Sequence, residues 1–392
     1  MTLLPEMLAA ARGRGVASVA VIERAGAEPQ AYWVPESDQE PAFLAYSITK
    51  TFTAALILTL CEEGQLRLED RLVRWFPHIS HADRISLREL LNHTSGIPDY
   101  GCLRAYSEGV MSSPSIPWSF ERFAAETFDK GLWFEPGQGW AYSNPGYMLL
   151  KRVAEEVTGL SYRDLIAERI VRPLGLRRTF VAESIHDLAA LAPGTSRELS
   201  ADGAPRDVRA HYHPGWVSHG VLASTASEIV RFLDGLFRGE LLSRQSLAQM
   251  LELVLLPTDE SDESEAPSEQ DALSRIGKPS YGLGLMGDPA SPWGLVVGHN
   301  GGGPCYRASA FHAFDLGGAS VCAMGAIEDG FDAECVVFDV LDHLAGGCGD
   351  ARAAQEESFR RNESRRAPSK SSEVSDALAA RPDRAARPRA GV

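Results

Sequence analysis

The segment Thr51–Glu63 places the firmest limit on how this 392-residue chain folds, because a helix over these residues would be apolar on nearly all its faces. Its apolar residues are Phe52, Ala54, Ala55, Leu56, Ile57, Leu58 and Leu60. The composition favours a helix, and a helix that is apolar on all its faces has to be surrounded by other elements. Gly64 stands where a helix commonly ends in a left-handed residue. The sequence therefore predicts a buried helix that ends at Glu63.

Strand signals lie near both ends of the chain. Val16–Val21 and Ala31–Val34 are typical of a pair of strands joined as a hairpin. Further strands are predicted at Tyr281–Leu285, Gly294–Gly298, Ala308–Phe314 and Ala319–Ala323, followed by an amphipathic helix at Phe331–Leu344. The pattern predicts an α/β (α+β) fold. In it the N- and C-terminal segments build one antiparallel sheet flanked by helices, with a mainly helical region of about residues 51–280 inserted.

Composition sets the limits of this domain and excludes some partners. We expect residues 1–348 to form the folded domain and the Arg/Ala/Ser/Pro-rich residues 349–392 to be a disordered tail. The net charge of −15 argues against a nucleic-acid partner. No apolar run reaches the ~18 residues of a membrane span, and Met1–Glu6 does not resemble a signal peptide. We therefore expect a cytoplasmic protein without a membrane partner; its oligomeric state stays open.

Ser47 and Lys50 are the first candidate functional pair. Residues three apart share one face of a helix, so a lysine at this spacing lies beside the serine hydroxyl. A serine is a poor nucleophile at neutral pH until a base or a strong local field activates it, and a lysine can supply either. The alternative is a helix-capping serine next to a solvated lysine.

Tyr142-Ser143-Asn144 is the second candidate motif, and it lies between Phe134–Gly137 and Pro145-Gly146, both predicted turns. A tyrosine on such a loop can reach into a cleft and act as a general base. The Asn144 amide can hold a substrate carbonyl or Lys50. The alternative is a structural tyrosine in a loop.

His299-Asn300-Gly301 is the third motif, and it follows the predicted strand Gly294–Gly298. Glycines let the backbone approach a substrate closely. A free N–H here, together with that of Ser47, can stabilise an oxyanion. His299 is expected to supply a hydrogen bond or charge at the pocket edge, although a glycine-rich turn with a structural histidine is the alternative.

A metal site is the weaker alternative. The histidines His211, His213 and His219 lie close together in the sequence, but no carboxylate or cysteine completes a ligand set at typical spacing.

These motifs resemble the serine β-lactamase and penicillin-binding-protein-like hydrolases. The most similar branch holds the class C β-lactamases, D,D-carboxypeptidases, D-aminopeptidases and β-lactamase-like esterases. The resemblance extends from about Val16 to Leu344. The segments that carry it are Tyr46–Ala54, Leu90–Ile97, Phe134–Gly137, Tyr142–Tyr147, Pro173–Leu176, Ser224–Ala226 and Gly298–Gly302.

The resemblance implies a β-lactamase/transpeptidase-like fold and a role for each motif. Ser47 would be the acylated nucleophile, Lys50 its activator, and Tyr142 the general base and acid. Asn144 would contact Lys50 and the substrate. The oxyanion hole would use the N–H groups of Ser47 and Gly302.

Two departures from the family pattern bear on specificity. His299 stands where many members carry lysine, which resembles the carboxypeptidase and aminopeptidase branches more than typical β-lactamases. His219 replaces a small residue often seen before the Ser-Thr-Ala segment, here Ser224–Ala226.

Together the motifs predict a cofactor-independent serine hydrolase. It would cleave a small-molecule ester, amide or peptide through an acyl-enzyme on Ser47, as an esterase or a D-amino-acid amidase or peptidase. The alternatives are β-lactamase or D,D-carboxypeptidase activity, and a non-catalytic binding or sensor protein on the same fold.

Overall fold

A computed structural model of the chain describes residues 3–256, 277–328 and 331–346. The predicted tail at 349–392 lies outside the described residues.

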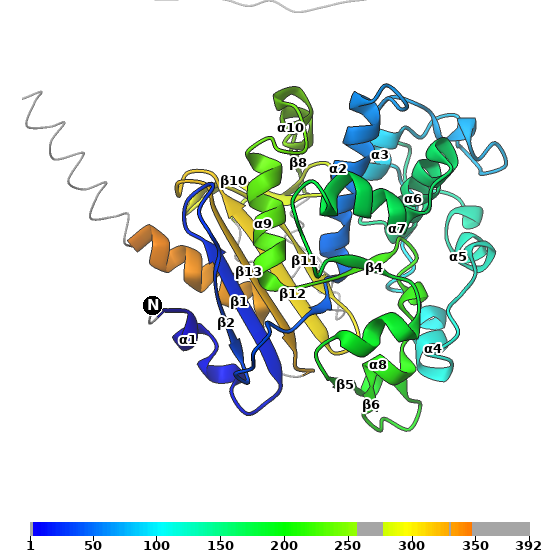
Figure 1. Ribbon diagram of the computed structural model, residues 1–392. Helices are drawn as coiled ribbons and strands as arrows, with labels where there is room; N and C mark the ends of the chain where they lie inside the picture. Colours follow the sequence, from blue (N-terminus) through cyan, green and yellow to red (C-terminus); the bar gives the residue numbers. More distant parts are fainter. Residues whose placement is uncertain (1–2, 257–276, 329–330, 347–392) are drawn as a thin grey trace, which may run out of the picture. The chain divides into compact units, whose positions relative to one another are not determined.

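One eight-stranded sheet organises the molecule, with strand order β2-β1-β13-β12-β11-β10-β9-β8 and antiparallel pairing throughout (Figure 1). Its strands are β1 (Val16–Ile22), β2 (Gln30–Val34), β8 (Val254–Leu255), β9 (Ser280–Tyr281), β10 (Met286–Ser291), β11 (Gly294–Gly302), β12 (Tyr306–Ala313) and β13 (Ala319–Ala326). The N-terminal β1 pairs with the C-terminal β13 from Val16↔Ala326 to Ile22↔Ser320. The predicted sheet from both ends of the chain is confirmed.

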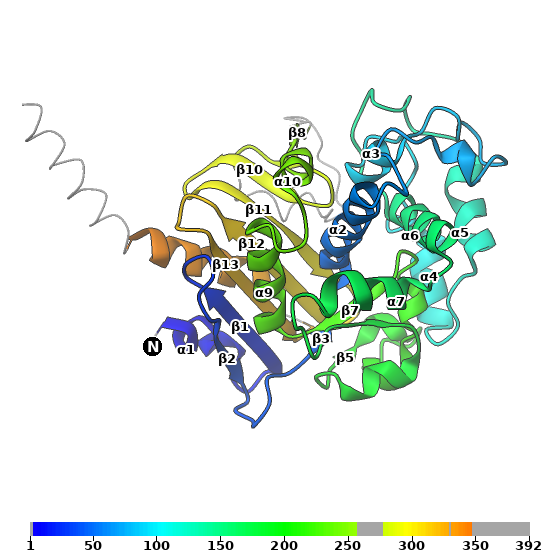
Figure 2. The ribbon, with the colours of Figure 1, turned by 45° about the horizontal axis from the view of Figure 1, so that its top comes forward.

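Both faces of this sheet are covered. Alternate residues of a strand point to opposite faces, and those of β13 belong to two different hydrophobic cores. Cys322 and Met324 of β13 belong to the larger core, which includes α9 (Ala226–Phe237). Val321 and Ala323 belong to the second core, together with Phe338 of the helix over residues 333–346. In Figure 2, α9 lies across the near face of the sheet.

The chain between β2 and β8 holds most of the helices and two small sheets. The helices are α2 (Thr49–Glu62), α3 (Leu87–Leu91), α4 (Arg104–Ser112), α5 (Phe120–Glu126), α6 (Asn144–Thr158), α7 (Tyr162–Ile166), α8 (Val208–His211), α9 and α10 (Arg244–Met250), and α1 (Leu3–Met7) precedes β1. One small sheet has the order β3 (Phe43–Leu44), β7 (Val221–Ser224), β4 (Phe180–Ala182), and the other pairs β5 (Thr195–Ser196) with β6 (Arg206–Asp207). None of the helices in the described ranges is both long and apolar enough to cross a membrane.

The predicted buried helix is confirmed as α2, which begins two residues earlier than expected. A 3-10 turn at Tyr46–Ile48 leads into it, and every residue from Thr49 to Leu58 is buried. Gly64 follows with φ +74°, a conformation that costs glycine little.

The predicted strand Tyr281–Leu285 is wrong, because only Tyr281 belongs to a strand, β9, and β10 begins at Met286. Two other boundaries that differ from the predictions bear on the candidate motifs. The strand β11 runs on to Gly302, because the ladder with β12 continues to the pair Gly302↔Arg307. The predicted turn at Pro145-Gly146 is instead the first turn of α6. The Ser143 hydroxyl caps this helix by accepting a hydrogen bond from the Gly146 N–H at 3.2 Å, and proline suits a first helical turn.

Candidate active site

Ser47 lies in the 3-10 turn that joins β3 to α2, so its backbone is fixed on both sides. The residue before it, Tyr46, has φ +43°, which is uncommon for a residue other than glycine. Two contacts hold this turn: the Ala45 N–H donates to the Leu222 carbonyl at 2.8 Å, and the Tyr46 hydroxyl donates to the Pro304 carbonyl at 3.2 Å. The serine is therefore presented by a constrained turn.

Lys50 is the centre of the polar cluster, one helical turn after Ser47. Its side chain is fully buried. The Nζ atom lies 3.2 Å from Ser47 Oγ, 2.7 Å from Asn144 Oδ1 and 3.0 Å from His219 Nε2. The structure thus brings together three side chains that sequence analysis selected, and adds His219.

Asp99 fixes the position of Asn144 through two hydrogen bonds. The Asn144 backbone N–H donates to Asp99 Oδ1 at 2.8 Å, and its side-chain Nδ2 donates to Oδ2 at 3.3 Å. The Gly101 N–H also donates to Oδ2. Burial raises the pKa of Asp99, and these hydrogen bonds and the Lys50 charge oppose that rise. Asp99 was not predicted from the sequence, because nothing in its local pattern indicates a partner 45 residues away.

Tyr142 lies in the loop before α6 and presents its ring to the lysine. The distance from Lys50 Nζ to the ring centroid is 4.6 Å, within the range of a cation–π contact. The same ring packs on His93, with centroids 4.4 Å apart.

His299 is buried in an aromatic cluster. Its Nε2 lies 2.9 Å from the Tyr281 hydroxyl, and its Nδ1 lies 2.6 Å from the Asn300 carbonyl. Burial, and secondarily the Lys50 charge, lower the pKa of His299 to about 3. The histidine is therefore neutral near pH 7, so the structure does not support the expectation that it supplies charge.

The glycines of β11 bring this strand against the nucleophile turn. A Cβ on Gly301 would lie 2.2 Å from the Ala45 carbonyl oxygen and 3.2 Å from Ser47 N. At such a short distance only glycine fits. Gly302, by contrast, has no heavy atom within 3.6 Å of a built Cβ, and it lines the same cavity as Ser47.

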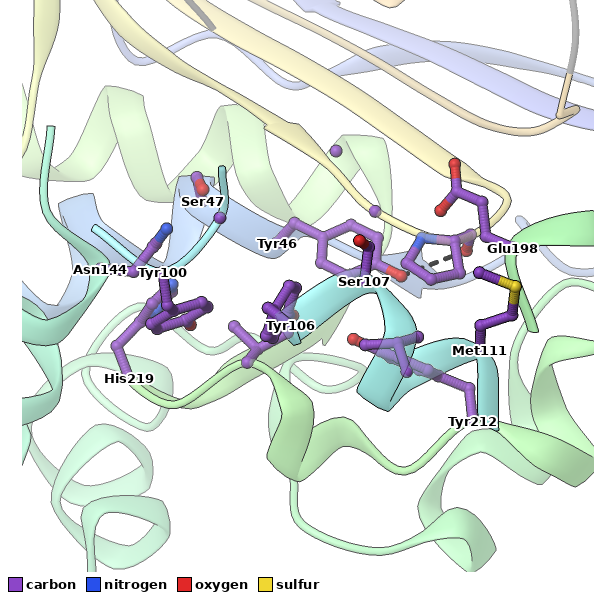
Figure 3. Close-up of a pocket in the computed structure, with 16 residues that line it drawn as sticks. Tyr46, Ser47, Tyr100, Tyr106, Ser107, Met111, Asn144, Glu198, Tyr212 and His219 are labelled. Carbon is purple, nitrogen blue, oxygen red and sulfur yellow. Dashed lines mark hydrogen bonds between the residues drawn. The ribbon is translucent and has the colours of Figure 1, made fainter. Parts of the chain in front are cut away.

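A cavity of about 350 Å³ opens at Ser47. Figure 3 shows Ser47, Asn144 and His219 at one end and Glu198 and Met111 at the other. The wall between them is largely aromatic and aliphatic, with Tyr46, Tyr100, Tyr106, Tyr212, Val110 and Val217. No lysine or arginine is among the described residues that line it, and neither is His299.

The three histidines of the metal alternative do not form a site. His211 is exposed and bonds the Asp207 carbonyl, His213 accepts from the Gly215 N–H, and His219 contacts Lys50. The part of the chain that the structure describes contains no group of three or more His, Cys, Asp or Glu residues able to hold a metal ion.

Comparison with known proteins gives consistent results. The family description "Beta-lactamase" matches residues 6–317. Penicillin-binding protein 4* of Bacillus subtilis (strain 168) is 29% identical over 318 residues, which is 77% of this chain and 64% of that protein. A D-aminopeptidase of Brucella anthropi is 32% identical over 156 residues, 39% of this chain and 28% of that protein. The matches therefore span less than two thirds of either relative's length.

A solved structure extends this similarity to nearly a whole protein. The crystal structure of a D-stereospecific amidohydrolase from Streptomyces sp. superposes with a TM-score of 0.70 at 28% sequence identity. The superposition covers 86% of this chain and 96% of the Streptomyces protein.

Proposed function

Because this chain belongs to the β-lactamase family, we propose that it is a serine hydrolase that cleaves a small amide or ester through a covalent acyl-enzyme on Ser47. The observation that carries the proposal is the contact of 3.2 Å between Ser47 Oγ and Lys50 Nζ at the end of a cavity. The names of two relatives, a D-aminopeptidase and a D-stereospecific amidohydrolase, support amide bonds next to a D-amino acid as the first substrates to test.

Lys50 is assigned the activation of the nucleophile. As a neutral amine it accepts the proton of Ser47 Oγ while Oγ attacks the substrate carbonyl carbon, and the carbonyl π electrons move to oxygen. Asn144 Oδ1 can only accept hydrogen bonds, so it takes up one N–H of the amine at 2.7 Å.

The backbone is assigned the stabilisation of the resulting oxyanion. The N–H groups of Ser47 and Gly302 are the donors we propose, and both residues line the cavity. Gly301 makes this pairing sterically possible, because any side chain there would strike the Ala45 carbonyl.

Tyr142 is assigned the donation of its hydroxyl proton to the leaving group, and the proton that Lys50 took from Ser47 then replaces it on the tyrosine oxygen. This assignment stays a prediction, since the contact seen is between Lys50 Nζ and the face of the Tyr142 ring.

The cavity wall favours a particular acyl group. Its tyrosines and aliphatic side chains suit an aromatic or aliphatic group of small size. A substrate carboxylate would find no lysine or arginine among the described lining residues, and its negative charge would meet Glu198. An amino-acid amide or ester without a free carboxylate therefore fits better than a carboxylate-bearing β-lactam or a D,D-dipeptide end.

Active-site labelling tests the proposal. The protein is treated with a fluorophosphonate probe, adducts are located by mass spectrometry, and turnover of D- and L-amino-acid amides, nitrophenyl esters and a penicillin is measured. We expect the adduct on Ser47, loss of labelling and turnover in Ser47→Ala, and retention of both in Ser112→Ala, which alters an exposed serine of α4. Full turnover by Ser47→Ala would refute the acyl-enzyme, and loss of activity with a chelator would instead favour a metal hydrolase.

A further inference from the structure

His219 contacts the nucleophile's activator, and the mechanism above gives it no role. Its Nε2 lies 3.0 Å from Lys50 Nζ, its side chain is only 1% exposed, and it lines the cavity beside Ser47. A neutral imidazole is the group to consider, because burial lowers the pKa of His219 well below its usual value. The positive charge of Lys50 adds to this effect.

The hydrogen bond has only one direction when Lys50 is an ammonium. An ammonium has donors and no acceptor, so Nε2 must accept and the imidazole proton must sit on Nδ1. Nδ1 has no hydrogen-bond partner among the described residues. Leaving a buried polar atom unpaired is costly. Both ring nitrogens of His299 have hydrogen-bond partners, whereas His219 bears this cost at Nδ1. Its contact with Lys50 is the interaction that accounts for its position.

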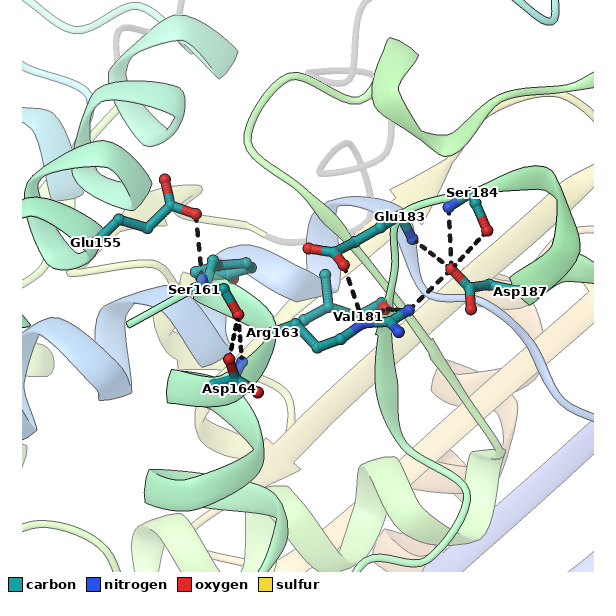
Figure 4. Close-up of polar contacts among 9 residues, drawn as sticks. Glu155, Ser161, Arg163, Asp164, Val181, Glu183, Ser184 and Asp187 are labelled. Carbon is teal, nitrogen blue, oxygen red and sulfur yellow. Dashed lines mark hydrogen bonds and ion pairs between the residues drawn. The ribbon is translucent and has the colours of Figure 1, made fainter. Parts of the chain in front are cut away.

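The surrounding scaffold holds His219 and Lys50 at a fixed separation. His219 lies two residues before β7, and β7 pairs with β4 through Val181↔Leu222. Arg163 of α7 donates to the Val181 carbonyl and contacts Glu183 and Asp187, as Figure 4 shows. These contacts tie β4, the strand that pairs with β7 next to His219, to α7.

The helix of Lys50 is tied to the same element. The Thr53 hydroxyl of α2 lies 2.8 Å from the Tyr162 hydroxyl of α7. The Leu222 N–H of β7 also donates to Thr49 Oγ1 of α2 at 3.0 Å. A separation fixed by two such links is what a positioning contact requires.

We propose that His219 is a positioning residue for Lys50: its Nε2 accepts one N–H of the lysine amine and so directs the lone pair toward Ser47 Oγ. This inference rests on the proposed acyl-enzyme chemistry. A neutral amine has two N–H groups and one lone pair. With one N–H on Asn144 Oδ1 and the other on His219 Nε2, the lone pair faces the third neighbour, the Ser47 hydroxyl.

The proton balance leaves His219 neutral throughout. The Oγ–H bond of Ser47 breaks as a third N–H bond forms on Lys50, and the Oγ electron pair forms the bond to the substrate carbonyl carbon. The new ammonium then donates to Ser47, Asn144 and His219, so each of its protons has an acceptor.

Two substitutions of His219 separate this role from packing. His219→Leu keeps the volume and removes the acceptor, whereas His219→Gln keeps an acceptor oxygen. The rate constant of Ser47 labelling by a fluorophosphonate, KM and kcat for the best substrate, and Tm are measured for both. His312→Gln is the matched control, because His312 is also buried but bonds Ser320 on the main sheet.

We expect His219→Leu to slow Ser47 labelling by about 10- to 100-fold with little change in KM, and His219→Gln to recover most of that loss. The acidic limb of the Leu variant's pH–rate profile is expected to move to lower pH, since the lysine ammonium has lost an acceptor. His219→Ala provides a second route: added imidazole is expected to restore labelling.

Equal labelling rates for the Leu and Gln variants, or an unmoved acidic limb together with no rescue by imidazole, would overturn the inference. Failure of the wild-type protein to label on Ser47 would instead overturn the proposed function, so the two failures are distinguishable.

Discussion

His219 and His299 are buried to the same extent, and both have a lowered pKa, yet they belong to different regions of the molecule. His219 contacts Lys50 and has one ring nitrogen without a partner among the described residues. His299 has both ring nitrogens occupied, by Tyr281 and the Asn300 carbonyl. Burial alone thus does not distinguish these two histidines, whereas the partners of their ring nitrogens do.

The largest effect is expected at the centre of the Lys50 region. Lys50→Met retains the length of the side chain in a fully buried position and removes the base, so we expect labelling of Ser47 to fall by about 10³-fold. The fluorophosphonate rate constant and Tm check this. Lys151→Met is the matched control, because Lys151 lies over the Tyr162 ring and contacts none of the proposed catalytic groups. A Lys50→Met protein that labels at the wild-type rate would remove the contrast between the surroundings of His219, which include Lys50, and those of His299.

An intermediate effect is expected at Asp99, which contacts Lys50 only through Asn144 in the hydrogen bonds described. Asp99→Asn is nearly isosteric but sets an NH2 group against the donors of Asn144 and Gly101. An unpaired buried donor costs about 1–3 kcal/mol, so kcat/KM is expected to fall by about 10- to 100-fold. Steady-state kinetics measures this at a temperature well below the variant's Tm. A fall in Tm with unchanged kcat/KM would make Asp99 a purely structural residue.

The smallest effect on activity is expected at His299. His299→Gln is expected to change kcat/KM by less than about tenfold, because His299 lines none of the cavity and contacts neither Ser47 nor Lys50 in the hydrogen bonds described. A larger loss than in His219→Leu would reverse our comparison.

The same variant tests the charge state of His299 through stability. A folded pKa of about 3 lies below the unfolded value of ~6.5. The stabilisation is therefore complete above that unfolded value and is lost as pH falls toward 3. Each such histidine steepens the decline by about 1.4 kcal/mol per pH unit. Denaturant unfolding between pH 7 and 5 is expected to show a shallower decline for His299→Gln than for the wild-type protein.

Local spacing explains what could be predicted from the sequence. Ser47 and Lys50 are three residues apart, so one helical turn is enough to bring them together. The apolar pattern of α2 and the strand signals at both ends of the chain likewise identified the buried helix and the sheet. These features depend on periodicity within a short segment.

Long-range contacts explain what could not be predicted. The contact from Lys50 to His219 spans 169 residues and the one from Asp99 to Asn144 spans 45. The available signal for His219 was that it replaces a small residue of the family pattern. The glycines after Gly298 suggested a turn, but pairing with β12 keeps them in the strand, so tertiary hydrogen bonding outweighed local propensity.

The pairing of β1 with β13 sets when the main sheet can be completed during synthesis. Val16 of β1 pairs with Ala326 of β13. This pair cannot form until Ala326 has been translated, which at 5–20 residues per second is roughly 15 to 60 s after Val16. The oxyanion donor proposed at Gly302 also emerges late. Ser47 and Lys50 are therefore synthesised long before β13, and the site that we propose can be complete only after nearly the whole sheet has left the ribosome.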